Sequence, residues 1–240
     1  MTGRIVLTRP RDEAEGMAAE LTARGYDTLI EPMLDIVPVP TAIPDLRNYR
    51  ALVFTSANGV RSFAGRSADR SLPAYAVGVR TADSLRAAGF TDVRGASGDA
   101  GLLAEFVSDT LGNAGPVLHI SALDVARDLD ALLAPACIAV DALALYEAVP
   151  AQGFSKPLVD ALYACTIDSV LFFSTRTAAT FGTLANKLGL AEMITSISAL
   201  CLSNQVAAEA EKLPWRTVMA APEPTAQSLV ALLPRAGHGP

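Results

Sequence analysis

The sequence predicts an α/β protein of two similar lobes, each a parallel sheet flanked by helices, joined by a two-stranded β linker with a cleft between the lobes. Three features of the 240 residues support this architecture. Short apolar segments alternate with amphipathic ones, one strand–turn–helix segment recurs later in the chain, and two long β-rich segments interrupt the alternation. The alternation predicts the fold class, the recurrence predicts two lobes, and the interruptions predict the linker.

Strand-like segments alternate with helical patterns from the N-terminus onward. Arg4–Thr8 is the first strand, Pro10 stands at a helix start, and Gly25 supplies the left-handed residue that ends the helix. Similar strands are expected at Ala51–Phe54, Ala74–Gly78, Asp92–Ala96, Val117–Ile120, Ser169–Phe173, Ile197–Leu202 and Arg216–Ala220. Short apolar strands separated by helices indicate parallel sheets covered on both faces.

One segment occurs twice, because Ala51–Phe63 (ALVFTSANGVRSF) matches Ser169–Phe181 (SVLFFSTRTAATF). Weaker matches keep the same order: Ala74–Leu85 with Ala199–Ala210, Ala96–Leu103 with Pro222–Leu229, and Arg4–Leu21 with Pro116–Leu133. The separation exceeds a solenoid period, which is ~20 to ~50 residues. It favours two lobes, although an alternating strand–helix chain can also align with itself after a shift.

Two long β-rich segments, Asp27–Pro40 and Cys137–Pro150, interrupt the alternation. Each is about twice the usual strand length of ~5–6 residues. We expect both to cross between the lobes and to lie side by side. One lobe then comprises residues 1–36 and 147–240, the other comprises 37–146, and the linkers lie at about 34–40 and 143–150.

Composition excludes several classes of protein. An apolar fraction of 51% and a charged fraction of 18% are typical of a globular chain. A net charge of −6 argues against general nucleic-acid binding but not against a small anionic ligand. No apolar stretch of ~18 residues predicts a membrane span, and Ile5–Leu7 is too short for a secretory signal. Cys137, Cys165 and Cys201 lack metal spacing and are expected to be buried thiols of a cytoplasmic protein.

Polar turns follow several of the expected strands. Residues 56–59 (SANG), 78–81 (GVRT), 174–177 (STRT) and 203–204 (SN) each end a strand and open a helix. Ligands of open α/β sheets bind beyond the carboxyl ends of strands, where helix N–H groups and the helix dipole attract carboxylate or phosphate. These residues are also common helix caps. Four such turns in two lobes favour an anion-binding cleft.

Familiar catalytic motifs are missing from the sequence. The chain contains no G-x-G-x-x-G, no G-x-x-x-x-G-K-[ST] and no G-x-S-x-G. Its two histidines make a metal site or a histidine-based triad unexpected. Tyr146, in the second crossing segment, is the best candidate for a catalytic phenol, and the alternative is an ordinary aromatic strand residue.

Seven motifs in order carry a resemblance to a known family: VLTRP, FTSANGV, AVGVRTADSL, LALYEAVP, LFFSTRTAATF, LCLSNQVAAEA and APEPTAQSLVALL. Together they cover essentially the whole chain, which resembles the uroporphyrinogen-III synthases. The resemblance implies two α/β lobes with a linker and a cleft. It also implies that hydroxymethylbilane, a linear tetrapyrrole octacarboxylate, is cyclised with inversion of ring D to uroporphyrinogen III and water. It implies a cytoplasmic enzyme without a metal or organic cofactor. We expect a monomer whose partner is this small molecule, and neither nucleic acid nor a membrane.

The resemblance also implies roles for individual residues. Tyr146 matches the family's cleft tyrosine, the candidate to assist departure of the hydroxyl. The implied substrate-binding residues are Arg9, Ser56, Asn58, Gly59, Thr81, Ser174, Thr175, Ser203 and Thr225. Val206 departs from the family, in which many members have threonine, so only backbone contacts are expected there. Two alternatives stay open: a non-enzymatic bilobal protein that binds a small anion, and a flavodoxin-like or nucleotide-binding domain.

Overall fold

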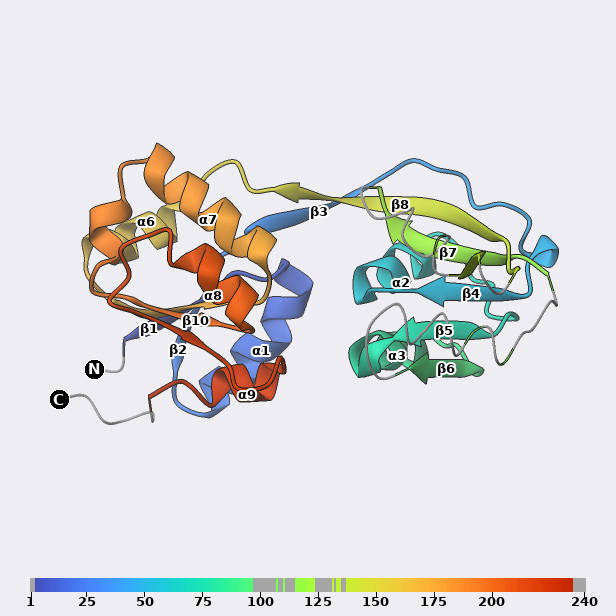
Figure 1. Cartoon of the computed structure of the whole chain (residues 1–240), viewed down its shortest axis with the longest axis horizontal. Coiled ribbons are helices and arrows are strands. Elements are labelled where there is room, and N and C mark those ends of the chain that lie inside the picture. Colours follow the sequence, from blue (N-terminus) through green and yellow to red (C-terminus); the bar gives the residue numbers. More distant parts are fainter. Residues whose placement is uncertain are drawn as a thin grey trace. The chain divides into compact units, whose positions relative to one another are not determined.

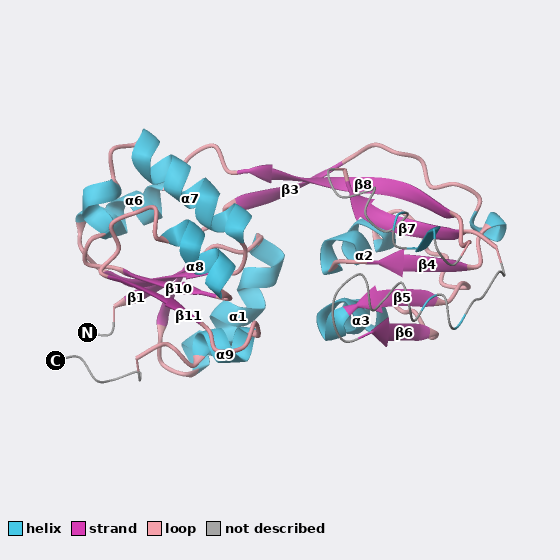
Figure 2. Cartoon of the chain, viewed as in Figure 1, coloured by secondary structure: helices cyan, strands magenta, loops and turns pink. Residues whose placement is uncertain are grey.

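The computed structural model describes residues 3–96, 115–123 and 137–234, together with positions 107, 110, 131, 133 and 134. The chain forms two compact units, one of Met1–Asp35 with Val149–Pro240 and the other of Ile36–Ala148 (Figure 1). Each unit contains one sheet with helices packed against it (Figure 2). The predicted α/β class and the predicted two-lobe organisation are therefore confirmed.

The sheet of the first unit has five parallel strands in the order β11-β10-β9-β1-β2. The strands are β1 (Arg4–Leu7), β2 (Asp27–Ile30), β9 (Ile167–Phe172), β10 (Ser198–Cys201) and β11 (Thr217–Ala220). The three central strands are almost completely buried, as the continuous apolar runs predict.

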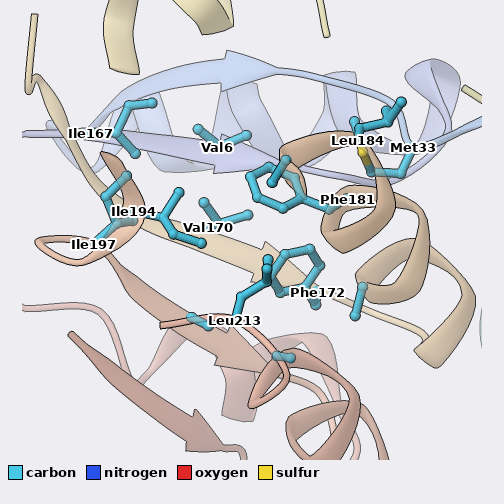
Figure 3. Packing of buried hydrophobic residues seen from close by; sticks show 14 of the residues in the cluster. Val6, Met33, Ile167, Val170, Phe172, Phe181, Leu184, Ile194, Ile197 and Leu213 are labelled. Atoms are coloured by element: carbon cyan, nitrogen blue, oxygen red, sulfur yellow. The ribbon is translucent and has the colours of Figure 1, made fainter. Parts of the chain in front are cut away.

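Helices cover both faces of this sheet (Figure 1). They are α1 (Arg11–Ala23), α6 (Lys156–Tyr163), α7 (Thr175–Lys187), α8 (Asn204–Ala210) and α9 (Ala226–Val230), with a 3-10 turn at Ala191–Ile194. Val6, Val170 and Phe172 pack on one face with α6, α7 and α8 (Figure 3). The alternate residues, including Leu7 and Leu171, pack on the other face with α1 and α9.

The sheet of the second unit has the strand order β3-β8-β7-β4-β5-β6. Its strands are β3 (Leu34–Pro38), β4 (Ala51–Phe54), β5 (Ala74–Val77), β6 (Val93–Ala96), β7 (Val117–Ala122) and β8 (Val140–Pro150). All the pairs from β8 to β6 are parallel. Helices α2 (Ala57–Ala64) and α3 (Gly78–Ala87) pack on one face, where Phe54, Phe63 and Phe90 contact one another. A 3-10 turn at Leu46–Asn48 precedes β4.

Strands β3 and β8 lead the chain from one unit to the other. The amide of Val39 donates to the carbonyl of Leu145 (3.0 Å) and the amide of Ala151 donates to the carbonyl of Met33 (3.1 Å), so the two segments run in opposite directions. The two-stranded linker is therefore present. Strand β8 is also a member of the second sheet, because it pairs with β7.

The prediction of one continuous crossing at Asp27–Pro40 is wrong. Its first part, β2, belongs to the sheet of the first unit, and only β3 crosses. Pro32 interrupts the segment because it has no N–H for a strand ladder. Glu31, next to it, turns inward and its carboxylate accepts hydrogen bonds from the amide (2.7 Å) and hydroxyl (2.5 Å) of Ser155.

The prediction of three buried thiols is correct only for Cys201. Cys137 and Cys165 are exposed and have positive φ angles of 55° and 51°. Cys165 ends α6, where its amide donates to the carbonyl of Leu162 (3.1 Å), so it occupies the left-handed position that follows a helix.

Two of the weaker repeats fall partly outside the described residues. These are Ala96–Leu103, of which only the backbone of Ala96 is described, and most of the C-terminal half of Pro116–Leu133. No helix in the described ranges is long and apolar enough to span a membrane.

Candidate functional site

Apart from Tyr146, which lies within β8, the predicted site residues lie at or just beyond the carboxyl ends of strands in both units. In the second unit Ser56 follows β4, Thr81 lies in the first turn of α3 after β5, and Tyr146 lies in β8. In the first unit Arg9, Ser174, Ser203 and Thr225 follow β1, β9, β10 and β11. Because the strands within each unit that precede these turns are parallel, the turns of one unit share one edge of its sheet. The cleft stays a prediction.

Four of the predicted binding residues cap helices with their side chains. The hydroxyl oxygens of Ser56, Ser174, Ser203 and Thr225 accept hydrogen bonds from the amides of Gly59, Thr177, Val206 and Ser228 at 3.2, 3.2, 3.4 and 3.1 Å. Each cap fixes the start of its helix and satisfies one otherwise unpaired amide. The reading of Ser56, Ser174 and Ser203 as helix caps is thus confirmed, and any binding role must coexist with it. The same reading of Thr81 is wrong, because Thr81 lies inside α3, which begins at Gly78 without a side-chain cap.

The helices that begin at these turns carry no carboxylate of their own at the start. The first turns of α2, α3, α7, α8 and α9 contain no acidic residue. By contrast, α1 has Asp12 and Glu13 in its first turn, and the start of α6 contacts the Glu31 carboxylate through Ser155. Since helix N-termini favour negative charge, the five starts without acidic residues suit an anionic ligand.

Tyr146 owes its orientation to an irregularity in β8. Ser121 pairs with Ala144 but Ala122 pairs with Tyr146, so Leu145 is an extra residue on β8. Because side chains alternate along a strand, a regular β8 would place Tyr146 on the same face as Ala144. The extra residue instead returns Tyr146 to the face on which Leu145 packs with α2.

The Tyr146 phenol lies within hydrogen-bonding distance of Ser56, the N-cap residue of α2. Its Oη is 2.7 Å from the Oγ of Ser56, and the tyrosine is 6% exposed. Two predicted site residues 90 positions apart are thereby brought together. The sequence placed both residues in the site but did not predict their contact.

The remaining predicted residues of the second unit are Asn58, Gly59 and Thr81. Asn58 accepts a short hydrogen bond from the guanidinium of Arg61. Gly59 is buried, and a Cβ on it would lie 3.1 Å from the carbonyl oxygen of Ile120, so its small size lets α2 approach β7. Thr81 is 5% exposed and faces the interior with Ala82.

In the first unit, Thr175 begins α7 and is half-buried, whereas Arg9 is held on two sides. The Arg9 guanidinium forms an ion pair with Glu13 (2.6 Å) and stacks on the ring of Phe173, 4.3 Å from its centroid. Its side chain is only 11% exposed. Neither partner was selected from the sequence, although the spacing of Arg9 and Glu13 is that of a helical ion pair.

Two further arginines lie in the first turns of site helices, Arg80 in α3 and Arg176 in α7. Both residues are exposed. Partial burial of the Arg80 guanidinium lowers its pKa from the usual value, yet an arginine stays protonated at neutral pH. The site edges of this acidic chain therefore present backbone amides together with positive charge.

The sequence did not single out a second group of polar side chains, on the opposite face of β7. His119 is 1% exposed and its Nε2 lies 3.3 Å from the hydroxyl of Thr55. Ser121 is also buried, and its hydroxyl has no hydrogen-bond partner within the described part of the chain. Across the described residues, no group of three or more His, Cys, Asp or Glu could hold a metal ion.

Two open pockets of the first unit lie away from the predicted residues. One is at the amino ends of β1 and β2 and includes Asp27, Asp160 and Asp168. The other lies beside β2 and includes Glu31 and Ser155. Neither contains a residue selected from the sequence.

Fold and site together define an α/β protein of two units whose helix starts suit anions. Among the residues selected from the sequence, only Tyr146 has a phenol, and this phenol contacts Ser56, the N-cap of α2. A family model described as "Uroporphyrinogen-III synthase HemD" matches residues 15–231. The chain belongs to this family.

Individual relatives are distant. "Porphyrin biosynthesis protein HemD" of Ruminiclostridium josui is 24% identical over 251 aligned positions, which cover 98% of this chain and 49% of that protein. The chain thus spans about half the length of this curated relative.

Two solved structures share the fold. Uroporphyrinogen-III synthetase from Helicobacter pylori is 20% identical with a TM-score of 0.66, covering 97% of this chain and 98% of the other. A mutant uroporphyrinogen III synthase from the extremely thermophilic bacterium Thermus thermophilus is 19% identical with a TM-score of 0.53, covering 96% of each chain.

Proposed function

We propose that this chain is a uroporphyrinogen-III synthase that cyclises hydroxymethylbilane, with inversion of ring D, to uroporphyrinogen III and water. Membership of the family supports the proposed reaction class. The observation on which the residue roles depend is the buried Tyr146 phenol, hydrogen-bonded to Ser56 at the carboxyl edge of the second sheet.

The proposed chemistry begins with loss of the substrate's hydroxyl group. The electron-rich pyrrole expels it as the phenol of Tyr146 supplies a proton, so that water leaves and a carbocationic ring system remains. Ring D then attacks through its substituted carbon, which gives the spiro intermediate and, after rearrangement, the inverted ring. A ring carbon finally loses a proton, which restores the phenol. Substrate and product differ by one water, so the reaction needs no oxidant or reductant.

Binding must also direct the cyclisation, because hydroxymethylbilane closes unaided to the symmetrical isomer I. Orientation of the reacting groups can contribute up to ~7–11 kcal/mol in ideal cases. The eight substrate carboxylates suit the helix starts that lack acidic residues and the arginines Arg80 and Arg176. Backbone amides at the starts of α7 and α8 are fixed by the caps Ser174 and Ser203, so they need no reorganisation when an anion binds.

We propose that the chain works as a monomer in the cytoplasm on this small molecule, without nucleic acid or membrane as partner. Sedimentation of the purified chain with and without hydroxymethylbilane tests the monomer. A stable dimer in both conditions would contradict it.

The decisive experiment measures the ratio of uroporphyrinogen isomers formed from fresh hydroxymethylbilane with and without the chain. Products are oxidised and separated by chromatography. We expect isomer III to replace isomer I at a rate proportional to protein concentration. Isomer I alone, from folded protein at several concentrations, would contradict the proposed activity, and bound but unconverted bilane would then favour the non-enzymatic binding protein.

A further inference from the structure

We infer that Ser56 is a positioning residue for Tyr146, whose phenol oxygen accepts a hydrogen bond from the Ser56 hydroxyl. The phenol's own proton is then directed away from Ser56, and the proposed reaction uses this proton. The catalytic meaning of this contact rests on the proposed function, whereas the contact itself does not. It gives Ser56 a different role from the direct substrate contact that the family resemblance implies.

The hydrogen-bonding capacity of Ser56 favours this direction of donation. A serine hydroxyl has one proton and two acceptor positions. The amide of Gly59 donates to one acceptor position at 3.2 Å, and Tyr146 Oη lies 2.7 Å away, a typical O–H···O distance. A hydroxyl that already accepts a hydrogen bond becomes a stronger donor. The positive end of the α2 dipole also favours an electron-rich oxygen beside it. Both effects favour donation from Ser56 to Tyr146.

The matching segment of the first unit uses its serine proton differently. Ser174 is the counterpart of Ser56, and Thr177 is the counterpart of Gly59. In the first unit the Ser174 hydroxyl donates to the Thr177 hydroxyl (3.2 Å), so its proton is used within its own helix. Glycine at position 59 has no side chain to accept this bond. The Ser56 hydroxyl therefore remains available to Tyr146.

The backbone of β8 is irregular at this contact. The extra residue Leu145 turns Tyr146 toward the start of α2. The amide of Leu123 donates to the carbonyl of Tyr146 (2.9 Å), and the amide of Val39 donates to the carbonyl of Leu145 (3.0 Å). Neighbouring strands thus hold both residues of the irregularity, and the phenol has a fixed direction of approach to Ser56.

The contact is tested first without any substrate, by NMR of protein labelled with ¹³C at the tyrosine ring carbon that bears the hydroxyl. The signal of Tyr146 is identified by its loss in Tyr146→Phe. We expect this signal to move in Ser56→Ala and to stay near its original position in Ser56→Thr, which keeps the hydroxyl and the cap. Ser174→Ala, which removes the matching cap in the other unit, should leave it in place. An unmoved signal in folded Ser56→Ala would overturn the inference.

The catalytic consequence is tested by a double-mutant cycle on isomer III formation. We expect Ser56→Ala to lower kcat about fivefold, or about 1 kcal/mol, with little change in KM, and Ser56→Thr to restore most of the rate. Ser56→Ala combined with Tyr146→Phe should be no slower than Tyr146→Phe alone, because Ser56 acts through the phenol. The inference would be overturned if the fold-losses of the two single substitutions multiplied in the double variant, or if Ser56→Ala changed only KM. Either result would show a direct role of Ser56 in binding. If the unmodified chain forms only isomer I, the proposed function fails, and the NMR comparison alone decides whether Ser56 positions Tyr146.

Discussion

At the scale of single residues, the proposed reaction depends most on the phenol of Tyr146. Tyr146→Phe keeps the ring and its packing but removes the hydroxyl that lies 2.7 Å from Ser56. We expect turnover to fall at least tenfold, which corresponds to about 1.4 kcal/mol of activation free energy. Steady-state kinetics of isomer III formation measure this, with circular dichroism as the control for folding. Unchanged turnover would remove Tyr146 from the catalytic role.

The three thiols should differ in reactivity, because only Cys201 is buried. Burial, with a smaller contribution from the charge of Glu211, raises the pKa of the Cys201 thiol to about 12. The thiolate is the reactive form, and its fraction at pH 8 falls as the pKa rises. We expect a disulfide reagent at pH 8 to modify Cys137 and Cys165 in the native chain, and Cys201 only after unfolding.

The measurement is a thiol count with and without denaturant. The variants Cys137→Ser and Cys165→Ser assign the rapidly reacting groups. Rapid modification of all three thiols in the native protein would show that Cys201 is not protected.

At the scale of secondary structure elements, two glycines in helices form a matched pair. Gly59 in α2 lies against the backbone of β7, and a Cβ there would be 3.1 Å from the carbonyl oxygen of Ile120. Around Gly16 in α1, by contrast, the described part of the chain places no atom outside the local helix backbone within 4 Å of such a Cβ. Alanine is favoured over glycine within a helix by about 1 kcal/mol, so Gly16→Ala should stabilise the protein by up to that amount.

Gly59→Ala should have the opposite effect. The higher helix propensity of alanine is outweighed by crowding of its methyl group against the central strand β7. Such crowding typically costs about 1–3 kcal/mol. The start of α2 must shift, and the Ser56–Tyr146 contact should weaken with it. We expect a lower denaturation midpoint and a lower kcat, measured by chemical denaturation and isomer analysis. A stabilised and fully active Gly59→Ala would show that α2 can move away from β7 without consequence.

The sequence predicted most elements because their physical causes are local. Strand β4 and helix α2 follow from an apolar run, a capping serine and a helical pattern in Ala51–Phe63. The division of Asp27–Pro40 was missed because apolar β-prone residues lie on both sides of Pro32, and only tertiary pairing shows that β2 joins the first sheet.

Site residues could be located from the sequence more readily than their contacts. Serines at strand ends are visible as caps, whereas the contact of Ser56 with Tyr146 depends on strand register. A single extra residue in β8 decides which face Tyr146 occupies, and no local pattern marks Leu145 as that residue. The Arg9–Phe173 stacking likewise joins residues that follow β1 and β9, two strands that are adjacent only in the folded sheet.

At the scale of the whole molecule, the hydrophobic cores are separate. Each of the four clusters of buried apolar residues found among the described residues draws its members from a single unit. Between the units the chain passes only through β3 and β8. Units with their own cores can unfold independently, so a single two-state transition is not expected.

The single tryptophan makes this independence measurable. Trp215 packs against Phe172 and Phe181 in the first unit, and its indole N–H donates to the carbonyl of Ala210 (2.9 Å). Tryptophan fluorescence therefore reports unfolding of that unit, whereas far-UV circular dichroism reports both units. We expect the two signals to follow different curves in urea. The variant Trp215→Phe, examined by circular dichroism, controls for effects of the indole itself. Coincident curves at every urea concentration would instead show that β3 and β8 couple the two cores into one cooperative unit.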